Sequence, residues 1–241
     1  MDIVYLVKNS LQNDSEELRY SLRSLKNIPH GKVVVVGEKP DWVTNVTFID
    51  VPQLGKKNAN WEKSLRTAAA RDDISEDFVM MNDDFFIMKP MGEIPLTNFG
   101  TMLDVIAHYD QRYPDGSWYA DSMRDQYKIL TEKGFTNLMS YELHTPLVLK
   151  KSNVLQLYRE VTEPLLQFRS FYGNYFHLGG VTVPDVKVFQ NERHNDPFYN
   201  ENPRAYLEQQ IFLSSTGGAF KRGLAGDFIR ASFSEKSPYE L

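Results

Sequence analysis

Three polar residues, Asn82, Asp83 and Asp84, stand between two hydrophobic runs, Phe78–Met81 and Phe85–Met88. Placing ionised carboxylates in such surroundings costs several kcal/mol per charge unless something compensates for it. A divalent cation is one such compensator, because Mg²⁺ and Mn²⁺ prefer oxygen ligands and are often held by one or two carboxylates together with phosphates. Asp83 and Asp84 are therefore candidate ligands of a divalent metal, Mn²⁺ or Mg²⁺.

The two acids are adjacent, and in a regular strand their side chains would point to opposite faces. Either the backbone turns at this point, or one acid binds the metal while the other orients a ligand. A third possibility is a solvated turn between two strands that has no chemical role. The residue types alone leave these alternatives open.

The first third of the chain alternates strand-like and helix-like segments. Short runs rich in β-branched and other apolar residues predict buried strands at residues 3–7, 32–37, 46–51 and 78–81. Helices are predicted after Asp14 and over residues 59–71. This alternation requires crossover connections, so we expect an α/β fold with a mostly parallel, twisted sheet flanked by helices. In such sheets ligands bind beyond the carboxyl ends of the strands, where Asn82–Asp84 would lie.

The first helix carries a start signal and an apolar face. Asp14 as N-cap and Glu17 three residues later form a capping-box pattern. The apolar face consists of Leu18, Leu22 and Leu25. Arg19 and Arg23 share another face, four residues apart, where their like charges repel each other. An anionic ligand or an internal acid would relieve this repulsion, and the sequence leaves both open.

The chain beyond residue 90 is predicted to be more helical. Its patterns indicate helices over residues 97–111, 120–133 and 152–168 and a strand over 181–189. The polar stretch Asn191–Pro203 is predicted to be a loop. Since no linker or repeat interrupts the sequence, we expect a single domain over residues 1–241.

Bulk properties limit the classes of function. The net charge of −5 gives no general attraction for nucleic acid or anionic lipid, so nucleic acid is not an expected partner. The absence of cysteine excludes thiol chemistry. No stretch approaches the roughly 20 apolar residues that span a bilayer. The first residues lack the basic flank and long apolar core of a signal peptide, so we expect a cytoplasmic protein.

Blocks that occur in order along nearly the whole chain resemble those of a known family. They are Asp2–Tyr5, Glu17–Leu25, Pro40–Trp42, Met81–Phe86, Glu142–Pro146, Phe168–Ser170 and Ser232–Glu240. The set is similar to the blocks of the Stealth family, which comprises sugar-1-phosphate transferases of bacterial capsular polysaccharide synthesis and the animal lysosomal-tagging enzyme. The segments ELRYSLRS and NDDFF are the most specific of them.

The resemblance implies a fold like that of the GT-A nucleotide-sugar transferases. It also implies a metal-dependent enzyme that passes a sugar phosphate from a nucleotide-sugar, with a UDP-sugar as the first expectation, to a hydroxyl of a glycan acceptor. Residues 1–90 would then bind the nucleotide-sugar and residues 91–241 the acceptor. Within this scheme Asp84 is a catalytic residue as well as a metal ligand.

The matching positions carry roles in that reaction. Asn82 would hold a phosphate or a sugar hydroxyl of the donor, and Arg19 and Arg23 would help to bind the donor. His144, in the His-x-Pro block, would be the general base, because histidine is the side chain that exchanges protons near neutral pH. Arg169 would clamp the phosphate bidentately. The structural alternatives are a histidine that caps a strand end and a surface arginine after the 152–168 helix.

One departure from the family keeps other functions open. The family follows its first strand with Trp-Val-Asp-Gly, whereas this chain has Val7-Lys8-Asn9-Ser10. The first alternative is a glycosyltransferase that moves only the sugar, to a glycan, a protein or modified DNA. A further alternative is a carbohydrate-binding module without catalytic activity.

Overall fold

The computed structural model describes residues 1–8, 14–189 and 202–241. Contacts divide the chain into two compact units. The first comprises Met1–Ile94, His144–Ser152 and Val186–Leu241, and the second comprises Pro95–Leu143 and Asn153–Asp185. The expected single domain, with a donor-binding part at residues 1–90, stays a prediction.

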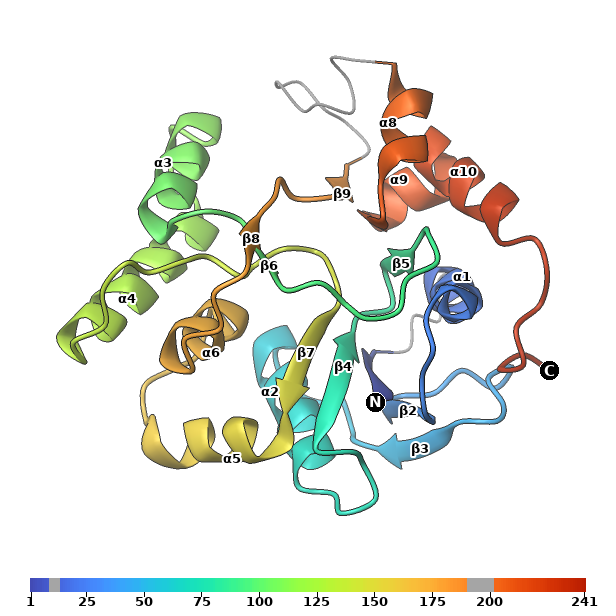
Figure 1. Ribbon diagram of the computed structural model, residues 1–241, viewed down its shortest axis with the longest axis horizontal. Helices are drawn as coiled ribbons and strands as arrows, with labels where there is room; N and C mark the ends of the chain where they lie inside the picture. Colours follow the sequence, from blue (N-terminus) through green and yellow to red (C-terminus); the bar gives the residue numbers. More distant parts are fainter. Residues whose placement is uncertain (9–13, 190–201) are drawn as a thin grey trace. The chain divides into compact units, whose positions relative to one another are not determined.

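The first unit is built on a mostly parallel sheet (Figure 1), so the predicted α/β class is confirmed. The strands in their order across the sheet are β3 (Thr47–Asp50), β2 (Val33–Gly37), β1 (Asp2–Val7), β4 (Asp77–Met81) and β7 (Leu147–Lys150). The first four run parallel, and β7 lies antiparallel beside β4. The four strands predicted from sequence are therefore the parallel part of this sheet.

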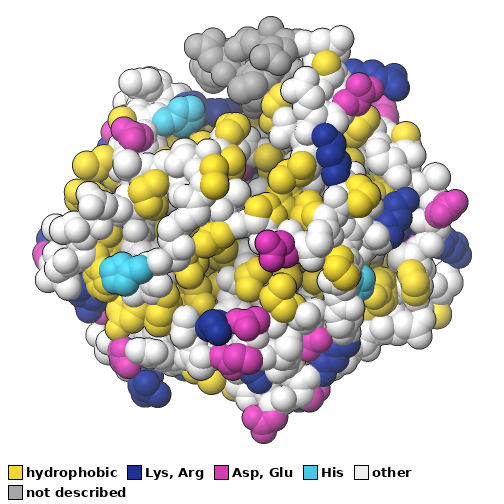
Figure 2. Space-filling view, in the orientation of Figure 1, with side chains coloured by type: hydrophobic (Ala, Val, Ile, Leu, Met, Phe, Trp, Pro, Cys, Tyr) yellow, Lys and Arg dark blue, Asp and Glu magenta, His cyan; other side chains and the backbone are white. Residues whose placement is uncertain are grey.

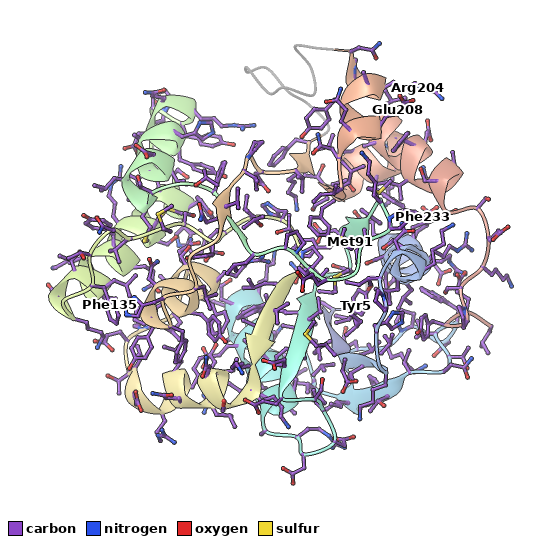
Figure 3. The ribbon with its side chains drawn as sticks, viewed as in Figure 1. Tyr5, Met91, Phe135, Arg204, Glu208 and Phe233 are labelled. Atoms are coloured by element: carbon purple, nitrogen blue, oxygen red, sulfur yellow. The ribbon has the colours of Figure 1, made fainter. Side chains whose placement is uncertain are left out.

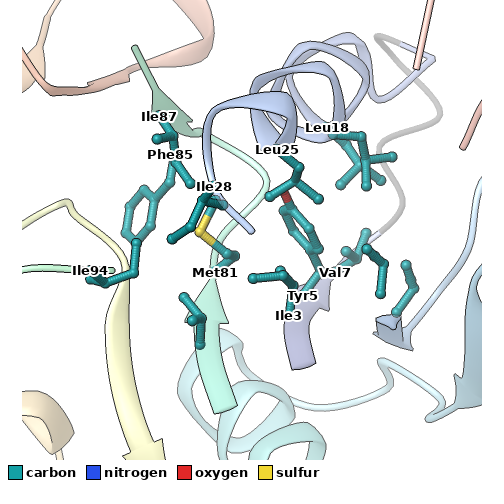
Figure 4. Close-up of a cluster of buried hydrophobic side chains, with 14 of the residues drawn as sticks. Ile3, Tyr5, Val7, Leu18, Leu25, Ile28, Met81, Phe85, Ile87 and Ile94 are labelled. Carbon is teal, nitrogen blue, oxygen red and sulfur yellow. The ribbon is translucent and has the colours of Figure 1, made fainter. Parts of the chain in front are cut away.

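Helices cover the sheet because its central strands β1 and β2 are almost entirely apolar and fully buried. The helical elements are α1 (Glu16–Ser24), the short 3₁₀ helix η1 (Leu25–Asn27) and α2 (Lys57–Ala69). Ile3, Tyr5 and Val7 of β1 pack with Leu18 of α1 and Leu25 in one buried cluster (Figure 4). α2 packs on β1 and β2. Every residue of β1 is buried, as the continuous apolar run predicts for a strand covered on both faces.

A second, small sheet of this unit holds the segment after the acidic pair. Its strands in order are β5 (Phe85–Ile87), β10 (Phe212–Ser215) and β9 (Lys187–Val188), and nearby are α8 (Pro203–Gln209), α9 (Gly217–Arg222) and α10 (Leu224–Ser232). Phe85 belongs to the cluster around β1 (Figure 4), whereas Phe86 belongs to a second cluster with Phe220 and Phe233, of which Phe233 is labelled in Figure 3. Because both faces of β5 are buried, the turn between β4 and β5 is fixed at both ends.

The second unit is mainly helical. It contains the parallel pair β6 (Thr97–Asn98) and β8 (Val181–Thr182), the helices α3 (Met102–Arg112), α4 (Trp118–Glu132) and α6 (Phe168–Tyr175), and most of α5 (Lys151–Glu160). No helix among the described residues is both long and apolar enough to cross a membrane.

Several predicted boundaries in this half are wrong, for local reasons. The helix predicted from residue 97 begins at 102, because Gly100 has a φ of +107° and Thr101 caps the helix by accepting from the Asp104 backbone N–H. The helix predicted over 152–168 ends at 160, ahead of Pro164.

The strand predicted over residues 181–189 is also wrong as one element. It is split into β8 and β9, which lie in different sheets, and Pro184 stands between them. Of the predicted loop Asn191–Pro203, residues 191–201 lie outside the described part of the chain, and Pro203 begins α8.

The predicted capping box at the start of α1 is wrong. The N-cap residue is Ser15, which has a φ of 50° and makes no side-chain cap hydrogen bond. The Asp14 carboxylate instead accepts a hydrogen bond from Arg19 Nη2 at 3.1 Å. Glu17 therefore does not serve the helix end, and its carboxylate lines a cavity.

Candidate active site

A cavity of about 430 Å³ opens in the first unit at the carboxyl ends of β1 and β4. Its walls come from the ends of these strands, the loop after β3, α1, α2, β9 and the segment after β10. The lining residues are Leu6, Val7, Lys8, Glu17, Gln53, Lys57, Asn60, Trp61, Ser64, Asn82, Asp83, Asp84, His144, Lys187, Ser215, Thr216 and Gly217. The sequence placed Asn82–Asp84 at this edge of the sheet, and the structure agrees.

The backbone turns at the acidic pair, as the first of the three alternatives proposed. β4 ends at Met81, and the turn is closed by the Phe85 backbone N–H, which donates to the Asn82 carbonyl at 3.3 Å. Asp83 and Asp84 consequently line the same cavity rather than opposite faces of a strand.

Asp84 is held by two side chains from the small sheet. Its Oδ2 accepts hydrogen bonds from Lys187 Nζ at 2.7 Å and from Ser214 Oγ at 3.1 Å. Strand pairing explains this, because Ser214 lies opposite both Phe85 of β5 and Lys187 of β9. Lys187 neutralises Asp84 in a setting where both side chains are largely buried.

Among the described residues, neither Asp83 nor Glu17 forms an ion pair like that of Asp84 with Lys187. Burial and the Asp84 carboxylate raise the pKa of Asp83 well above its usual range, although Lys187 and Lys57 oppose the shift. Burial, followed by repulsion from Asp83 and Asp84, raises the pKa of Glu17 to about 7. The cavity thus concentrates more negative charge than the described residues neutralise.

Strand pairing also brings His144 to the cavity. β7 runs antiparallel to β4 with Leu147 opposite Met80, so the residues just before β7 lie beside those just after β4. His144 is half-buried, lines the cavity, and meets Phe85 edge-on with ring centroids 6.4 Å apart. The structure therefore places the predicted base in the same cavity as the predicted metal ligands.

Arg19 and Arg23 are not among the lining residues, and both bind Glu240. Arg23 donates from Nε at 2.7 Å and from Nη2 at 2.8 Å, and Arg19 donates from Nη1 at 3.2 Å. The Glu240 side chain is completely buried, and the Arg19 guanidinium also stacks 4.1 Å from the Trp42 ring centre. The geometry favours the internal acid over the anionic ligand as the partner of these arginines.

We expect Glu240→Gln to destabilise the protein by about 2–3 kcal/mol. Removing one partner of a buried ion pair leaves the other charge uncompensated, and the amide still accepts one hydrogen bond, which limits the loss. Urea unfolding measures the effect. Glu208→Gln is the matched control, because Glu208 pairs with Arg204 on the exposed face of α8 (Figure 3) and such pairs contribute about 0.5 kcal/mol or less. Equal losses in the two variants would contradict the structural role of Glu240.

Arg169 belongs to the second unit, in the first turn of α6. It is buried rather than a surface residue, so that alternative is wrong, and its Nε donates to the Tyr141 carbonyl at 2.9 Å. Burial lowers the pKa of Arg169, while Glu142 and Asp185 oppose the shift. Its proposed role as a phosphate clamp stays a prediction.

The sequence matches no model of a protein family and no curated protein. Among solved structures, the chain is similar to a crystal structure of the galactosyltransferase LgtC in complex with donor and acceptor sugar analogs, with 14% identity and a TM-score of 0.47. That match covers 98% of this chain and 96% of the other. An active-site mutant of LgtC matches with 14% identity and a TM-score of 0.49, covering 99% and 98% of the two chains.

Two carboxylates could hold a divalent cation here. Within residues 1–8, 14–189 and 202–241, no group of three or more His, Asp or Glu side chains is placed to share a metal ion. Mg²⁺ and Mn²⁺ sites, however, commonly use one or two carboxylates and complete the shell with phosphates and water. The raised pKa of Asp83 reflects burial first and repulsion from Asp84 second, and the charge of a cation would offset both, so Asp83 and Asp84 fit such an ion.

Exposed charges bear on the choice of partner. On the face shown in Figure 2, acidic and basic side chains are mixed rather than gathered by sign. A protein that binds nucleic acid usually presents a stripe of Lys and Arg. This face and the net charge of −5 therefore give no support for a nucleic-acid partner.

The raised pKa of Glu17 predicts a pH-dependent effect on stability. The folded-state pKa of about 7 exceeds the ordinary value of 4.5, so the Glu17 carboxyl ionises at a lower pH in the unfolded chain than in the folded one. The stability of the wild type therefore falls as pH rises between these two values. Glu17→Gln removes the ionisation. We expect it to gain about 2 kcal/mol at pH 8, less than the full shift implies because the side chain is partly exposed.

Urea unfolding at pH 4 and pH 8 measures this difference. The gain of Glu17→Gln should vanish at pH 4, where the carboxyl is protonated in both states. Glu235→Gln, at an exposed position of the C-terminal segment, should show no such dependence on pH. A loss of stability in Glu17→Gln at pH 8 would contradict the prediction.

Proposed function

We propose that the protein is a glycosyltransferase that uses a nucleotide-sugar donor and a divalent cation, Mn²⁺ or Mg²⁺. The observation that carries the proposal is the cavity at the carboxyl ends of the parallel strands, whose lining includes Asp83, Asp84 and Lys57. A nucleoside diphosphate needs both features, a cation held by carboxylates and further positive charge for its phosphates.

The chain's own residues take defined parts in this scheme. Asp83 and Asp84 hold the cation, and Lys187 keeps Asp84 in place. Asn82 offers an amide to a phosphate or a sugar hydroxyl, and His144 accepts the proton of the acceptor hydroxyl. When bound, the cation supplies charge stabilisation to the departing phosphate.

A second candidate is the transfer of a sugar phosphate to a glycan hydroxyl. It is favoured by the presence of His144 in one cavity with Asn82–Asp84, since both segments match blocks of the Stealth family. Phosphoryl transfer also needs cations that face the oxygens of the transferred group. Arg19 and Arg23 bind Glu240, and Arg169 is not among the residues that line the cavity. Within the cavity this requirement would therefore fall on lysines, and we rank sugar transfer first.

The nucleotide that leaves distinguishes the two reactions. The purified protein is incubated with UDP-, GDP-, CDP- and ADP-sugars and Mn²⁺ or Mg²⁺, with water as the initial acceptor, and products are separated by ion-exchange chromatography. A diphosphate supports sugar transfer, and a monophosphate supports sugar-phosphate transfer. Melting temperatures are measured in parallel, because a ligand at 100 times its Kd stabilises the fold by about 2.7 kcal/mol. No product and no thermal shift with any donor would refute both candidates.

A further inference from the structure

Two buried polar atoms of the cavity have no hydrogen-bond partner among the described residues. They are Oε1 of Glu17, which extends from α1, and Oγ of Ser215, at the end of β10. Ser215 is 1% exposed. An unsatisfied buried polar group costs about 1–3 kcal/mol, so such atoms call for an explanation.

Both residues line the same part of the cavity wall, where α1 meets the segment that follows β10. A Cβ built at Gly217 would be 3.7 Å from Glu17 Oε2, so the Glu17 carboxylate lies against the segment that directly follows Ser215. Both supporting elements are firmly packed, because Leu18 of α1 is completely buried and all four residues of β10 are buried. The two side chains are therefore held in place by their neighbours.

Other polar residues of the cavity have partners within the protein. Asp84 binds Lys187 and Ser214, and Gln53 donates to the Val51 carbonyl at 2.7 Å. Asn60 exchanges two hydrogen bonds with the backbone of Gly55, at 2.8 and 2.9 Å. Among the described lining residues, only Glu17 and Ser215 carry a fully buried side-chain oxygen without a partner.

The charge in this part of the cavity indicates the kind of group that fits. Glu17 is acidic and lies close enough to Asp83 and Asp84 for their charges to interact, so a phosphate placed against the Glu17 carboxylate, rather than on a cation held by the two aspartates, would be repelled. A neutral hydroxyl can donate to a carboxylate oxygen, and a second hydroxyl can exchange a hydrogen bond with a serine. Neighbouring hydroxyls of a sugar ring meet both requirements.

We propose that Glu17 and Ser215 form a subsite that binds hydroxyl groups of the transferred sugar. This inference rests on the glycosyltransferase function proposed above and names the part of the donor that this part of the cavity wall recognises. The nucleoside diphosphate lies elsewhere, along Asn82–Asp84 and Lys57. Glu17 and Ser215 therefore determine affinity for the sugar and not for the nucleotide.

The test compares UDP with UDP-sugars by isothermal titration calorimetry in the presence of Mn²⁺. The sugars are glucose, galactose and N-acetylglucosamine, and the variants are Glu17→Ala, Glu17→Gln and Ser215→Ala. We expect Glu17→Ala to lower the affinity for the preferred UDP-sugar about 10- to 100-fold and Ser215→Ala to lower it about 5-fold. The affinity for UDP itself should change less than about 2-fold. Glu17→Gln, which keeps the shape and one acceptor, should fall between wild type and Glu17→Ala.

Deoxy analogues of the preferred donor identify the hydroxyl. Wild type should lose affinity for the analogue that lacks the bound hydroxyl, and the matching variant should lose no more, since the shared contact is already gone. Ser140→Ala is the matched control, because Ser140 Oγ is also buried and has no partner among the described residues but belongs to the second unit. Melting temperatures confirm that each variant is folded.

The outcomes separate this inference from the proposed function. If the variants lower the affinities for UDP and for the UDP-sugar equally, or lower neither affinity, the subsite is refuted while donor binding stands. The subsite is also refuted if wild type binds UDP-sugars no more tightly than UDP and the variants leave both affinities unchanged. If wild type binds neither UDP nor any of these UDP-sugars, the proposed use of a UDP-sugar donor fails, and the subsite fails with it.

Discussion

Replacing Asp84 or Asp83 by Asn is expected to lower the rate of transfer by about 10³-fold and to leave the protein folded. A bound cation supplies several kcal/mol of charge stabilisation in the transition state, and about 4 kcal/mol corresponds to a factor of 10³. Both acids line the cavity, so each substitution removes one of the two carboxylates available to the ion. The rate is measured from release of the nucleotide, with Mn²⁺ varied over a wide range.

Stability should change little in either variant because two effects oppose each other. Asp84→Asn weakens the contact with Lys187 but removes repulsion within the acidic group, and Asp83→Asn relieves burial of a charge and repulsion from Asp84 at the cost of attraction to Lys187 and Lys57. Asp50→Asn is the matched control, because Asp50 ends the parallel strand β3 at the same edge of the sheet, is exposed and does not line the cavity. An active Asp83 or Asp84 variant that loses several kcal/mol of stability would show that the acids are structural.

The sequence predicts the parallel sheet well because its signal is local. β1, β2 and β4 are short apolar runs, and burial on both faces requires such runs whatever lies next to them in space. The position of Asn82–Asp84 follows for the same reason, since a polar triplet directly after a buried strand must lie at the carboxyl end of that strand.

The partners of these residues could not be predicted, because they depend on pairing over long distances in sequence. Lys187 and Ser214 reach Asp84 only through the register of β9, β10 and β5. Glu240 joins Arg23 across 217 residues. No local pattern records such contacts, although the like charges of Arg19 and Arg23 did indicate an anionic partner.

Glu17 shows how a correct local pattern can mislead. Its spacing from Asp14 fits a capping box, and helix propensity alone would place its side chain at the helix end. The structure instead directs it into the cavity, with one oxygen lacking a partner among the described residues. A residue that satisfies a structural pattern and yet leaves that role unfilled is a candidate for function.

Replacing His144 by Ala is expected to slow transfer by about 10²–10⁴-fold with little change in KM, because a general base acts on the acceptor proton in the transition state. His144→Gln, which keeps hydrogen bonding but cannot accept the proton, should be as slow as His144→Ala. The rate is measured at saturating donor over a range of pH, and His108→Ala, at an exposed position of α3, is the control.

The contact with Phe85 offers a different role, in which His144 packs the segment that leads into β7. In that case both His144 variants would unfold at lower urea concentration and still transfer sugar at a near-normal rate. Antiparallel pairing of β4 and β7 places His144 beside the acidic turn in either role, so its position alone does not distinguish them. A variant that is slow but as stable as wild type would establish His144 as the base.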